Sequence, residues 1–273
     1  VDGSNDGRVL RVAAPAIVAG VTIRNGRLAT PSSNIFDTGG AAILSNGNLI
    51  LRDSVVMSNS TIGSGGAIFN LGNLVIDNSA ILSNTSEGGG GGVFVYLGTL
   101  TISRTLLAGN VTAGQFGGAI ESYRPVYLTD VTIRDNTAGS FGGGLVTSNI
   151  AYLNRVTLLG NRALSGAAIF AQQGGLTLTN VTVSHNVAAN NYGGIYISGE
   201  SVSLYLQHST IAYNSRTNSA GNGFNGLISS HSHVRIANTI FAFNEGRNCG
   251  GTENNWTSLG HNLASDATCA FTQ

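Results

Sequence analysis

The stretch Gly117-Gly-Ala-Ile-Glu-Ser-Tyr-Arg-Pro-Val-Tyr-Leu-Thr-Asp-Val-Thr-Ile-Arg-Asp-Asn136 is one copy of a unit that recurs along almost the whole chain. Each copy opens on a pair of small residues, alternates apolar and polar residues, and closes on Asn. The closing residues follow one another at steps of 25, 26, 26, 25, 25, 28 and 30 residues, and they are Asn59, Asn84, Asn110, Asn136, Asn161, Asn186, Asn214 and Asn244. A nearly fixed period in this range is typical of a solenoid.

Two columns of aliphatic residues precede each closing Asn. The residues ten places before it are Leu49, Leu74, Leu100, Val126, Ala151, Leu176, Leu204 and Val234. The residues eight places before it are Leu51, Ile76, Ile102, Leu128, Leu153, Leu178, Leu206 and Ile236. The position between the two columns is mixed in character, which is the alternation of a strand with one buried face.

A third apolar column lies three places before each Asn and predicts a second strand beyond a corner. Short strands that stack on their equivalents one coil later form a parallel β-helix, and parallel crossovers are normally right-handed. The sequence therefore predicts an all-β fold, a single-stranded right-handed parallel β-helix (solenoid) of about nine to ten coils of about 25 residues. A leucine-rich horseshoe is the rival solenoid, but these copies lack its Leu-x-x-Leu-x-Leu signature.

The repeated Asn and Gly residues are predicted to be structural. Asn tolerates the left-handed backbone of a tight corner, and stacked amides can form a hydrogen-bonded ladder. Glycine pairs such as Gly117-Gly118 are predicted to supply positive φ or close backbone approach. No predicted helix follows the glycine pairs, so they do not indicate a phosphate site.

The charge balance argues against two classes of partner. The chain of 273 residues carries 13 basic residues, all of them Arg, and 13 acidic ones. A net charge near zero removes the electrostatic case for nucleic acid or an anionic membrane. No apolar run approaches the roughly 20 residues of a membrane helix, so no membrane insertion is predicted.

The chain is predicted to be one domain in three segments. Residues 1–38 form an irregular first coil, residues 39–244 the regular coils, and residues 245–273 a C-terminal cap. Cys249 and Cys269 both lie beyond the last full coil, which predicts a single disulfide that clasps the end of the solenoid. A disulfide indicates an oxidising location, so the protein is expected to be secreted or on the cell surface.

Several motifs together resemble one family. These are the start Val1-Asp-Gly, the segment Val21-Thr-Ile-Arg-Asn-Gly, the repeated Gly-Gly-x-Ile/Val units, and the ending that contains Cys249-Gly-Gly and Asp266-Ala-Thr-Cys269. The chain resembles the secreted bacterial right-handed β-helix repeat proteins with a C-terminal Cys-clasped module. Its Gly-Gly-Ala-Ile copies are similar to those of chlamydial polymorphic outer-membrane adhesins. The resemblance implies the fold and export, and it does not imply a particular activity.

The outward column Tyr127, Tyr152, Thr177 and Tyr205 is the predicted ligand-binding face. Aromatic rings with amide and hydroxyl neighbours can stack on sugar rings, although Tyr is also a good strand former that packs on its neighbour. The favoured hypothesis is an extracellular, surface-associated adhesion or carbohydrate-binding β-helix without catalytic activity. Its expected partner is a polysaccharide or a cell-surface glycan, and its oligomeric state is left open.

The alternative hypothesis is a polysaccharide lyase or glycoside hydrolase that acts along one face of the β-helix. The same fold hosts pectate lyases and polygalacturonases, which is an argument by analogy. The candidate catalytic residues are Glu121, Asp130, Arg104 and Arg155, and the last three are predicted to form an ion-pair ladder across adjacent coils. No two acids of this set share a column on adjacent coils, which disfavours a two-carboxylate hydrolase.

The sequence predicts no metal site and no cofactor, and calcium enters only with the lyase hypothesis. Residues 2–7 resemble the start of a calcium loop, but no Glu follows at the required place. His231 and His233 alternate on one predicted strand, where scattered surface histidines are favoured over a metal pair. Only His261 lies near the two cysteines, so a zinc site is not indicated.

Overall fold

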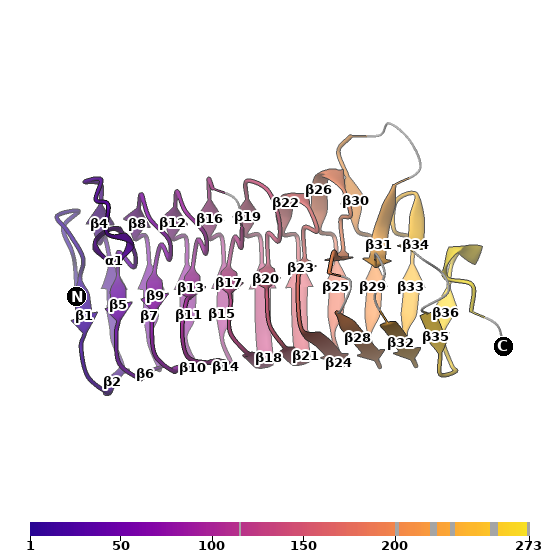
Figure 1. Cartoon of the computed structure of the whole chain (residues 1–273), viewed down its shortest axis with the longest axis horizontal. Helices are drawn as coiled ribbons and strands as arrows, with labels where there is room; N and C mark the ends of the chain where they lie inside the picture. Colours follow the sequence, from indigo (N-terminus) through magenta and orange to yellow (C-terminus); the bar gives the residue numbers. More distant parts are fainter. Residues whose placement is uncertain (115, 200–201, 219–222, 230–232, 252–255, 272–273) are drawn as a thin grey trace.

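The computed structural model describes residues 1–114, 116–199, 202–218, 223–229, 233–251 and 256–271. The chain winds into an elongated parallel β-solenoid whose two termini lie at opposite ends of the rod (Figure 1). Three parallel sheets, named here sheets I, II and III, run along the rod. Each strand pairs with its equivalent one coil later, so neighbouring coils satisfy one another's backbone groups.

Sheet I contains ten strands among the described residues. They are β1 (Leu10–Val12), β5 (Ile43–Ser45), β9 (Ile68–Asn70), β13 (Val93–Val95), β17 (Ile120–Ser122), β20 (Leu145–Thr147), β23 (Ile169–Ala171), β27 (Ile195–Ile197), β31 (Phe224–Ser229) and β34 (Arg247–Gly251). These strands follow the glycine pairs of the repeat.

Sheet II contains 18 strands in the part of the chain that the structure describes, and it bends along a row of corners. The strands before the corner are β2 (Ala16–Ala19), β6 (Leu49–Arg52), β10 (Leu74–Asp77), β14 (Leu100–Ser103), β24 (Gly175–Thr179), β28 (Ser203–Gln207), β32 (His233–Ala237) and β35 (Trp256–Ser258). Two long strands continue through the corner, β18 (Val126–Arg134) and β21 (Ala151–Leu159). The strands after the corner are β3 (Thr22–Arg24), β7 (Val55–Met57), β11 (Ala80–Leu82), β15 (Leu106–Ala108), β25 (Thr182–Ser184), β29 (Thr210–Ala212), β33 (Ile240–Ala242) and β36 (Leu263–Ala264).

Sheet III contains eight short strands within the described ranges. They are β4 (Arg27–Leu28), β8 (Ser60–Thr61), β12 (Thr85–Ser86), β16 (Val111–Thr112), β19 (Thr137–Ala138), β22 (Arg162–Ser165), β26 (Val187–Asn191) and β30 (Ser215–Arg216). The described helices are the single turn α1 (Ile35–Thr38) and the 3-10 turn η2 (Ala267–Cys269).

The predicted fold class is confirmed, and the number of coils is slightly lower than predicted. A coil that contributes a strand to every sheet occurs eight times in the described residues, because sheet III has eight strands. The chain beyond β30 adds strands to sheets I and II alone, so the ninth and tenth coils are partial. The solenoid therefore has about eight complete turns in place of the predicted nine or ten.

The aliphatic columns of the repeat form the core. Leu49, Leu74 and Leu100 pair in register on adjacent coils and are 0% exposed. The residues that alternate with them face outward, as Ile50 at 37% exposed and Tyr127 at 39% exposed illustrate. The period of two in the sequence therefore reports the two faces of each strand correctly.

The closing asparagines form a buried ladder. Asn110 Nδ2 donates to Asn136 Oδ1 at 2.9 Å and to the Ile81 carbonyl at 2.9 Å, and its backbone N–H donates to the same Asn136 oxygen at 2.8 Å. The pattern repeats from Asn59 to Asn244. Every ladder amide thus satisfies polar groups that the core would otherwise leave unpaired.

The left-handed corner lies one residue earlier than the sequence suggested. The residues directly before the closing asparagines have φ between 52° and 65°, and they are Ser58, Ser83, Gly109, Asp135, Gly160, His185, Tyr213 and Phe243. The asparagines themselves turn inward with negative φ. The recurring Asn side chains therefore form the ladder, and the residue before each Asn forms the corner.

Glycine is required at the start of the copy quoted above. Gly117 has φ of 69°, and a methyl group added at Gly118 would lie 2.3 Å from the Gly143 carbonyl oxygen of the next coil. The first glycine therefore supplies the turn and the second allows the coils to approach closely.

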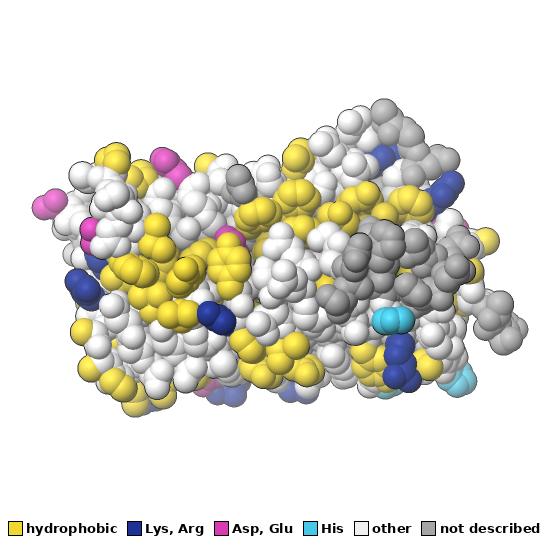
Figure 2. All heavy atoms as spheres, in the orientation of Figure 1, with side chains coloured by type: hydrophobic (Ala, Val, Ile, Leu, Met, Phe, Trp, Pro, Cys, Tyr) yellow, Lys and Arg dark blue, Asp and Glu magenta, His cyan; other side chains and the backbone are white. Residues whose placement is uncertain are grey.

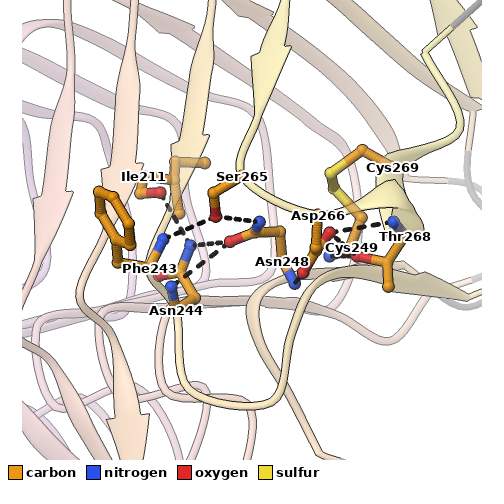
Figure 3. The surroundings of a disulfide bond; sticks show 9 residues. All are labelled: Ile211, Phe243, Asn244, Asn248, Cys249, Ser265, Asp266, Thr268 and Cys269. Carbon is orange, nitrogen blue, oxygen red and sulfur yellow. Dashed lines mark hydrogen bonds between the residues drawn. A yellow bond between two sulfur atoms is a disulfide. The ribbon is translucent and has the colours of Figure 1, made fainter.

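The disulfide prediction is confirmed, and Figure 3 shows its surroundings. Cys249 of β34 is bonded to Cys269 of η2, and the Cys249 N–H donates to Thr268 Oγ1 at 3.1 Å. Asn248, next to Cys249, accepts from Asn244 Nδ2 at 2.8 Å and donates to Ser265 Oγ at 3.1 Å (Figure 3). The cap therefore terminates the asparagine ladder as well as closing the end of the rod.

A search of the described residues for a bilayer-spanning helix finds none of sufficient length and hydrophobicity.

Candidate functional site

The outer face of sheet I carries a second apolar row, separate from the core. From β5 to β31, one residue of each strand points away from the core cluster, and all of these residues but Tyr196 are buried by their neighbours. Arg11 of β1, which is exposed, pairs with Leu44 at the N-terminal end of this row. In coil order this row is Leu44, Phe69, Phe94, Glu121, Val146, Phe170, Tyr196 and Ile228. Glu121 is its one charged member.

Aromatic rings gather on this face in two clusters, one on each side of Glu121. The N-terminal aromatic cluster consists of Phe36, Phe69, Phe94, Tyr96 and Tyr123. The C-terminal aromatic cluster consists of Phe116, Phe141, Phe170, Tyr192 and Tyr196. Neighbouring ring centroids in the two clusters lie as close as 5.0 Å and 4.5 Å. Figure 2 shows apolar side chains in bands across this side of the rod.

Glu121 of β17 lies between Phe94 and Val146 in the strand register and is only 3% exposed. Its carboxylate packs against the loop of the preceding coil, where a methyl group added at Gly89 would lie 1.6 Å from Oε2. The loop reads Glu87-Gly-Gly-Gly-Gly-Gly92, so it presents backbone alone next to the acid. The run of glycines thus makes room for a carboxyl group on an otherwise apolar face.

An open depression of about 460 Å³, called the cavity below, lies beside this carboxyl group. Its lining residues come from three successive coils, and they are Ser64, Glu87, Gly88, Gly89, Phe94, Gly114, Phe116, Glu121 and Tyr123. This volume lies within the range of sites that bind small molecules. Both aromatic clusters contribute at least one residue to the wall. The buried acid Glu121, Tyr123 and aromatic residues therefore line one space, together with the exposed residue Glu87.

Burial raises the pKa of Glu121 to about 7, and a hydrogen bond from the Tyr123 hydroxyl opposes this rise. The pKa of Tyr123 is raised to about 12, first by burial and then by the charge of Glu121 and the hydrogen bond to it. A carboxyl group with a pKa near 7 carries a proton for much of the time at neutral pH. Glu121 can therefore donate a hydrogen bond or a proton, or accept a positive charge.

The cavity has an acidic character among the residues that the structure describes. Those that line it include two Glu residues and no Arg, and the chain contains no Lys. Arg124 lies at the rim of the N-terminal aromatic cluster, where its Nε donates to the Tyr96 carbonyl at 3.1 Å. The exposed rings of Tyr96 and Tyr123, at 40% and 41%, border the same region.

The four candidate catalytic residues do not come together. Glu121 lies on sheet I, whereas Asp130 and Arg155 form a bidentate pair on sheet II, with Arg155 Nε and a terminal nitrogen at 2.6 Å and 2.8 Å from the two Asp130 oxygens. Arg104 bonds to Asp77 and not to Asp130, so the predicted three-residue ladder is split into two pairs. The hydrogen bonds and charge of Arg155 hold the pKa of the Asp130 carboxyl below its ordinary value.

These corner residues have a structural reason for their positions. Arg104, Asp130 and Arg155 adopt φ of 46°, 57° and 54° in the bend of sheet II. Their side chains are more than 40% exposed, so the pairs lie in water, where an ion pair gains little.

The predicted ligand-binding column lies on the outside of sheet II. Tyr127 and Tyr152 stack on each other with ring centroids 5.5 Å apart and planes 7° from parallel. Thr177 and Tyr205 continue the column in register, and Arg235 lies 6.0 Å from the Tyr205 ring. The two stacked tyrosines cover each other's facing ring surfaces, and they are 39% and 45% exposed, about as much as Tyr96 and Tyr123 on sheet I. The column on sheet II lacks the cavity and the buried acid that sheet I combines with its rings.

No group of three or more His, Cys, Asp or Glu side chains within the described ranges is arranged to hold a metal ion. Asp2, in the segment that resembles a calcium loop, accepts hydrogen bonds from the Ser4 N–H, Arg24 Nε and Asn25 Nδ2. These contacts occupy the carboxylate. The proposed pairing of His231 with His233 lies outside the described residues, because His231 is not among them.

Sequence reasoning selected Glu121 but missed Glu87, Phe94, Tyr96 and Tyr123. A signal for the site was present in the repeat. The column of Leu44, Phe69, Phe94 and Val146 is apolar from coil to coil, and Glu121 interrupts it next to a run of five glycines. A single acidic residue in an apolar column predicts either a carboxyl group that is buried at a cost in stability or a ligand-binding or catalytic site.

No protein-family model matches the chain, and no curated protein or solved structure is significantly similar to it. The fold and the site define the class: a parallel β-solenoid that carries an acidic, aromatic-lined cavity on one face.

Proposed function

We propose that this protein binds a polysaccharide or a cell-surface glycan along the outer face of sheet I. In this proposal it works outside the cell as a surface-associated adhesion or carbohydrate-binding protein. The observation that carries the proposal is the cavity that Glu121 and Tyr123 share between the two aromatic clusters. Sugar sites combine apolar ring surfaces with a few convergent polar groups, and this cavity has both.

Two further features favour this assignment. Tyr96 and Tyr123 leave 40% and 41% of their surfaces exposed beside the cavity, where they can stack on sugar rings. The disulfide between Cys249 and Cys269 fits a secreted or cell-surface location, because such bonds persist in oxidising compartments. The adhesin-like repeats of the sequence agree with that location.

The proposal is tested with a panel of immobilised polysaccharides, assayed with and without calcium for bound protein and for released reducing or unsaturated ends. We expect binding that the substitutions Tyr96→Ala and Tyr123→Ala weaken. Tyr127→Ala is the matched control, because Tyr127 is 39% exposed but lies on sheet II. Binding lost in Tyr127→Ala and retained in Tyr123→Ala would move the site to the other face.

The second candidate function is cleavage of the bound glycan. The observation that favours it is the pKa of about 7 at Glu121 in a cavity that Glu87 also lines. A glycoside hydrolase needs a protonated carboxyl group to donate to the leaving oxygen and a second carboxylate to activate water or attack the sugar. Release of reducing ends that disappears in both Glu121→Gln and Glu87→Gln would establish this activity.

A further inference from the structure

We propose that the cavity on sheet I takes a protonated amine, so that the glycan it recognises carries unacetylated amino sugars. This inference rests on the proposed glycan-binding function and names its ligand class. Its basis is the set of groups in the cavity: Glu87 and Glu121 both line it, and the described lining residues include no basic side chain.

A negative charge on Glu121 must be compensated. A carboxylate removed from water is costly unless an opposite charge or several hydrogen bonds compensate it. Glu121 is 3% exposed, and the Tyr123 hydroxyl is the side chain that hydrogen-bonds to it. An ammonium group in the cavity would supply the missing positive charge, and Glu87 would add a second negative neighbour.

The aromatic walls of the cavity also favour a cation. Phe94, Phe116 and Tyr123 line the same cavity as Glu87 and Glu121. Aromatic ring faces attract cations, and the attraction grows where water is excluded. Carboxylates together with ring faces form a surface that favours a positively charged group over a neutral or an acidic one.

The other charged and titratable groups nearby do not already neutralise the acid. Arg124 lies two residues after the end of β17. Its Nε donates to the Tyr96 carbonyl, and the residue does not line the cavity. Burial and the Tyr123 hydrogen bond together account for the pKa of Glu121. The raised pKa of Tyr123 keeps its phenol neutral, and Val146 on the next coil carries no charge.

The aromatic rings beside the cavity favour a sugar as the carrier of the amine. The cavity opens between the two aromatic clusters, whose accessible rings are the exposed Tyr96 and Tyr123 on one side and the half-buried Phe116 and Phe141 on the other. Sugar rings can stack on these accessible rings while one amine enters the cavity. A lysine side chain of a protein partner is the competing source of an amine, and the experiment separates the two.

Proton release from Glu121 on binding can be measured directly. At about pH 6 the free protein holds a proton on Glu121, because the pKa of this group is about 7. Pairing with an ammonium favours the ionised carboxylate, so binding expels that proton. A neutral sugar that accepts a hydrogen bond from protonated Glu121 expels none.

The experiment is isothermal titration calorimetry of the full chain at about pH 6, in buffers of different ionisation enthalpy that report proton release. The three ligands are β-1,4-linked hexamers of glucosamine, N-acetylglucosamine and glucose, which differ only at carbon 2. We expect the glucosamine hexamer to bind at least about tenfold more tightly than the other two and to give a net release of protons, smaller than one per site because the bound amine takes up part of a proton.

Two variants and a control sharpen the result. Glu121→Gln keeps the size of the side chain and should abolish proton release and weaken glucosamine binding by about tenfold or more. Glu87→Gln should weaken binding by a smaller factor and leave proton release intact. Asp135→Asn is the control, because Asp135 is an exposed carboxyl group directly after strand β18 of sheet II that pairs with Arg134, and its substitution should change neither property.

Equal or tighter binding of the neutral hexamers without proton release would overturn the amine inference and leave the glycan-binding function standing. Failure of all three hexamers, together with a silent polysaccharide panel, would overturn both. Binding of a lysine oligopeptide with proton release, and of none of the sugars, would overturn the amino-sugar assignment and the glycan-binding function together.

Discussion

The carboxylate of Glu121 lies against the backbone of Gly89 on the preceding coil, so closely that a methyl group at position 89 would fall 1.6 Å from Oε2. The acid and the glycine are 32 residues apart in sequence but adjacent along the rod. This contact fixes the acid at the wall of the cavity, and it makes the site a property of two coils rather than of one motif.

The substitution Gly89→Ala should displace this carboxylate without unfolding the protein. Gly89 does not have positive φ, and the obstructing atoms are the far end of a flexible side chain, so the loss of stability should stay below about 1 kcal/mol. The displaced carboxyl group becomes more hydrated, and its pKa should fall from about 7 toward its ordinary value of 4.5. A carbon-13 NMR titration of the Glu121 carboxyl measures this change. An unchanged pKa together with unchanged glycan binding would show that the contact does not shape the site.

The stability of the protein should depend on pH through Glu121. The pKa is about 7 in the folded state and 4.5 ordinarily, so between these values the folded state binds the proton that the unfolded state has lost. Stability therefore falls as pH rises through this window, by about 3 kcal/mol in all, and it is level above it. Glu121→Gln should lack this decline.

Urea unfolding of the wild type and Glu121→Gln at about pH 5 and about pH 8 measures the effect, because the other titrating groups cancel in the comparison. The variant should gain stability relative to the wild type at the higher pH. A difference between the two proteins that does not change with pH would contradict the burial of Glu121.

The asparagine ladder should be a main determinant of stability. Asn136→Ala removes the acceptor for the Asn110 N–H at 2.8 Å and the donor to the Leu107 carbonyl at 3.0 Å, both buried. We expect a loss of about 2–4 kcal/mol in the free energy of unfolding. Asn46→Ala is the control, because Asn46 is exposed and outside the ladder, and it should cost far less. Equal effects of the two substitutions would mean that the ladder adds no net stability.

Removal of the disulfide should loosen the C-terminal cap before the rest of the rod. The bond closes a segment with a sequence separation of 20 residues, for which chain entropy gives about 3 kcal/mol. In the double variant Cys249→Ser/Cys269→Ser, the Cys249 amide, which donates to Thr268 Oγ1 in the native protein, should lose protection in hydrogen exchange. Amides in sheet I near Glu121 should keep theirs. Simultaneous loss of protection along the whole rod would indicate that the cap and the coils unfold as one unit.

The ion pair of Asp130 with Arg155 should have no part in ligand binding. Both side chains are exposed on sheet II, and Glu121 lies on sheet I. Asp130→Asn and Arg155→Gln should therefore both bind the glycan with the affinity of the wild type. Loss of binding in both variants would return the site to the corner of sheet II.

The repeat itself made most of the fold predictable. Alternation around Leu49 and Leu51 reports strand faces, and the spacing of Asn59 and Asn84 reports the coil, because each coil packs only on its neighbours. The disulfide was predictable because Cys249 and Cys269 have no other partner. The number of complete coils was less certain from the sequence, since apolar columns persist into coils that lack a strand in sheet III.

The candidate site was only partly predictable, for a physical reason. Glu121 was selected by its charge, but its burial depends on Gly89, Phe94 and Phe116, which come from loops and strands of other coils. The pairing of Arg104 with Asp77 in place of Asp130 depends on the path of a long side chain around a corner. Column spacing fixes which backbones are adjacent, and it does not fix which side chains cover one another.

The central claim is that glycan binds in the cavity beside Glu121. The most direct test is a titration of labelled protein with the tightest ligand of the polysaccharide panel, followed by backbone amide NMR shifts. The account predicts the largest shifts at Gly88, Gly89, Phe94 and Tyr123, which lie at the cavity. Shifts confined to Tyr127 and Tyr152 on sheet II, with none around Glu121, would contradict it.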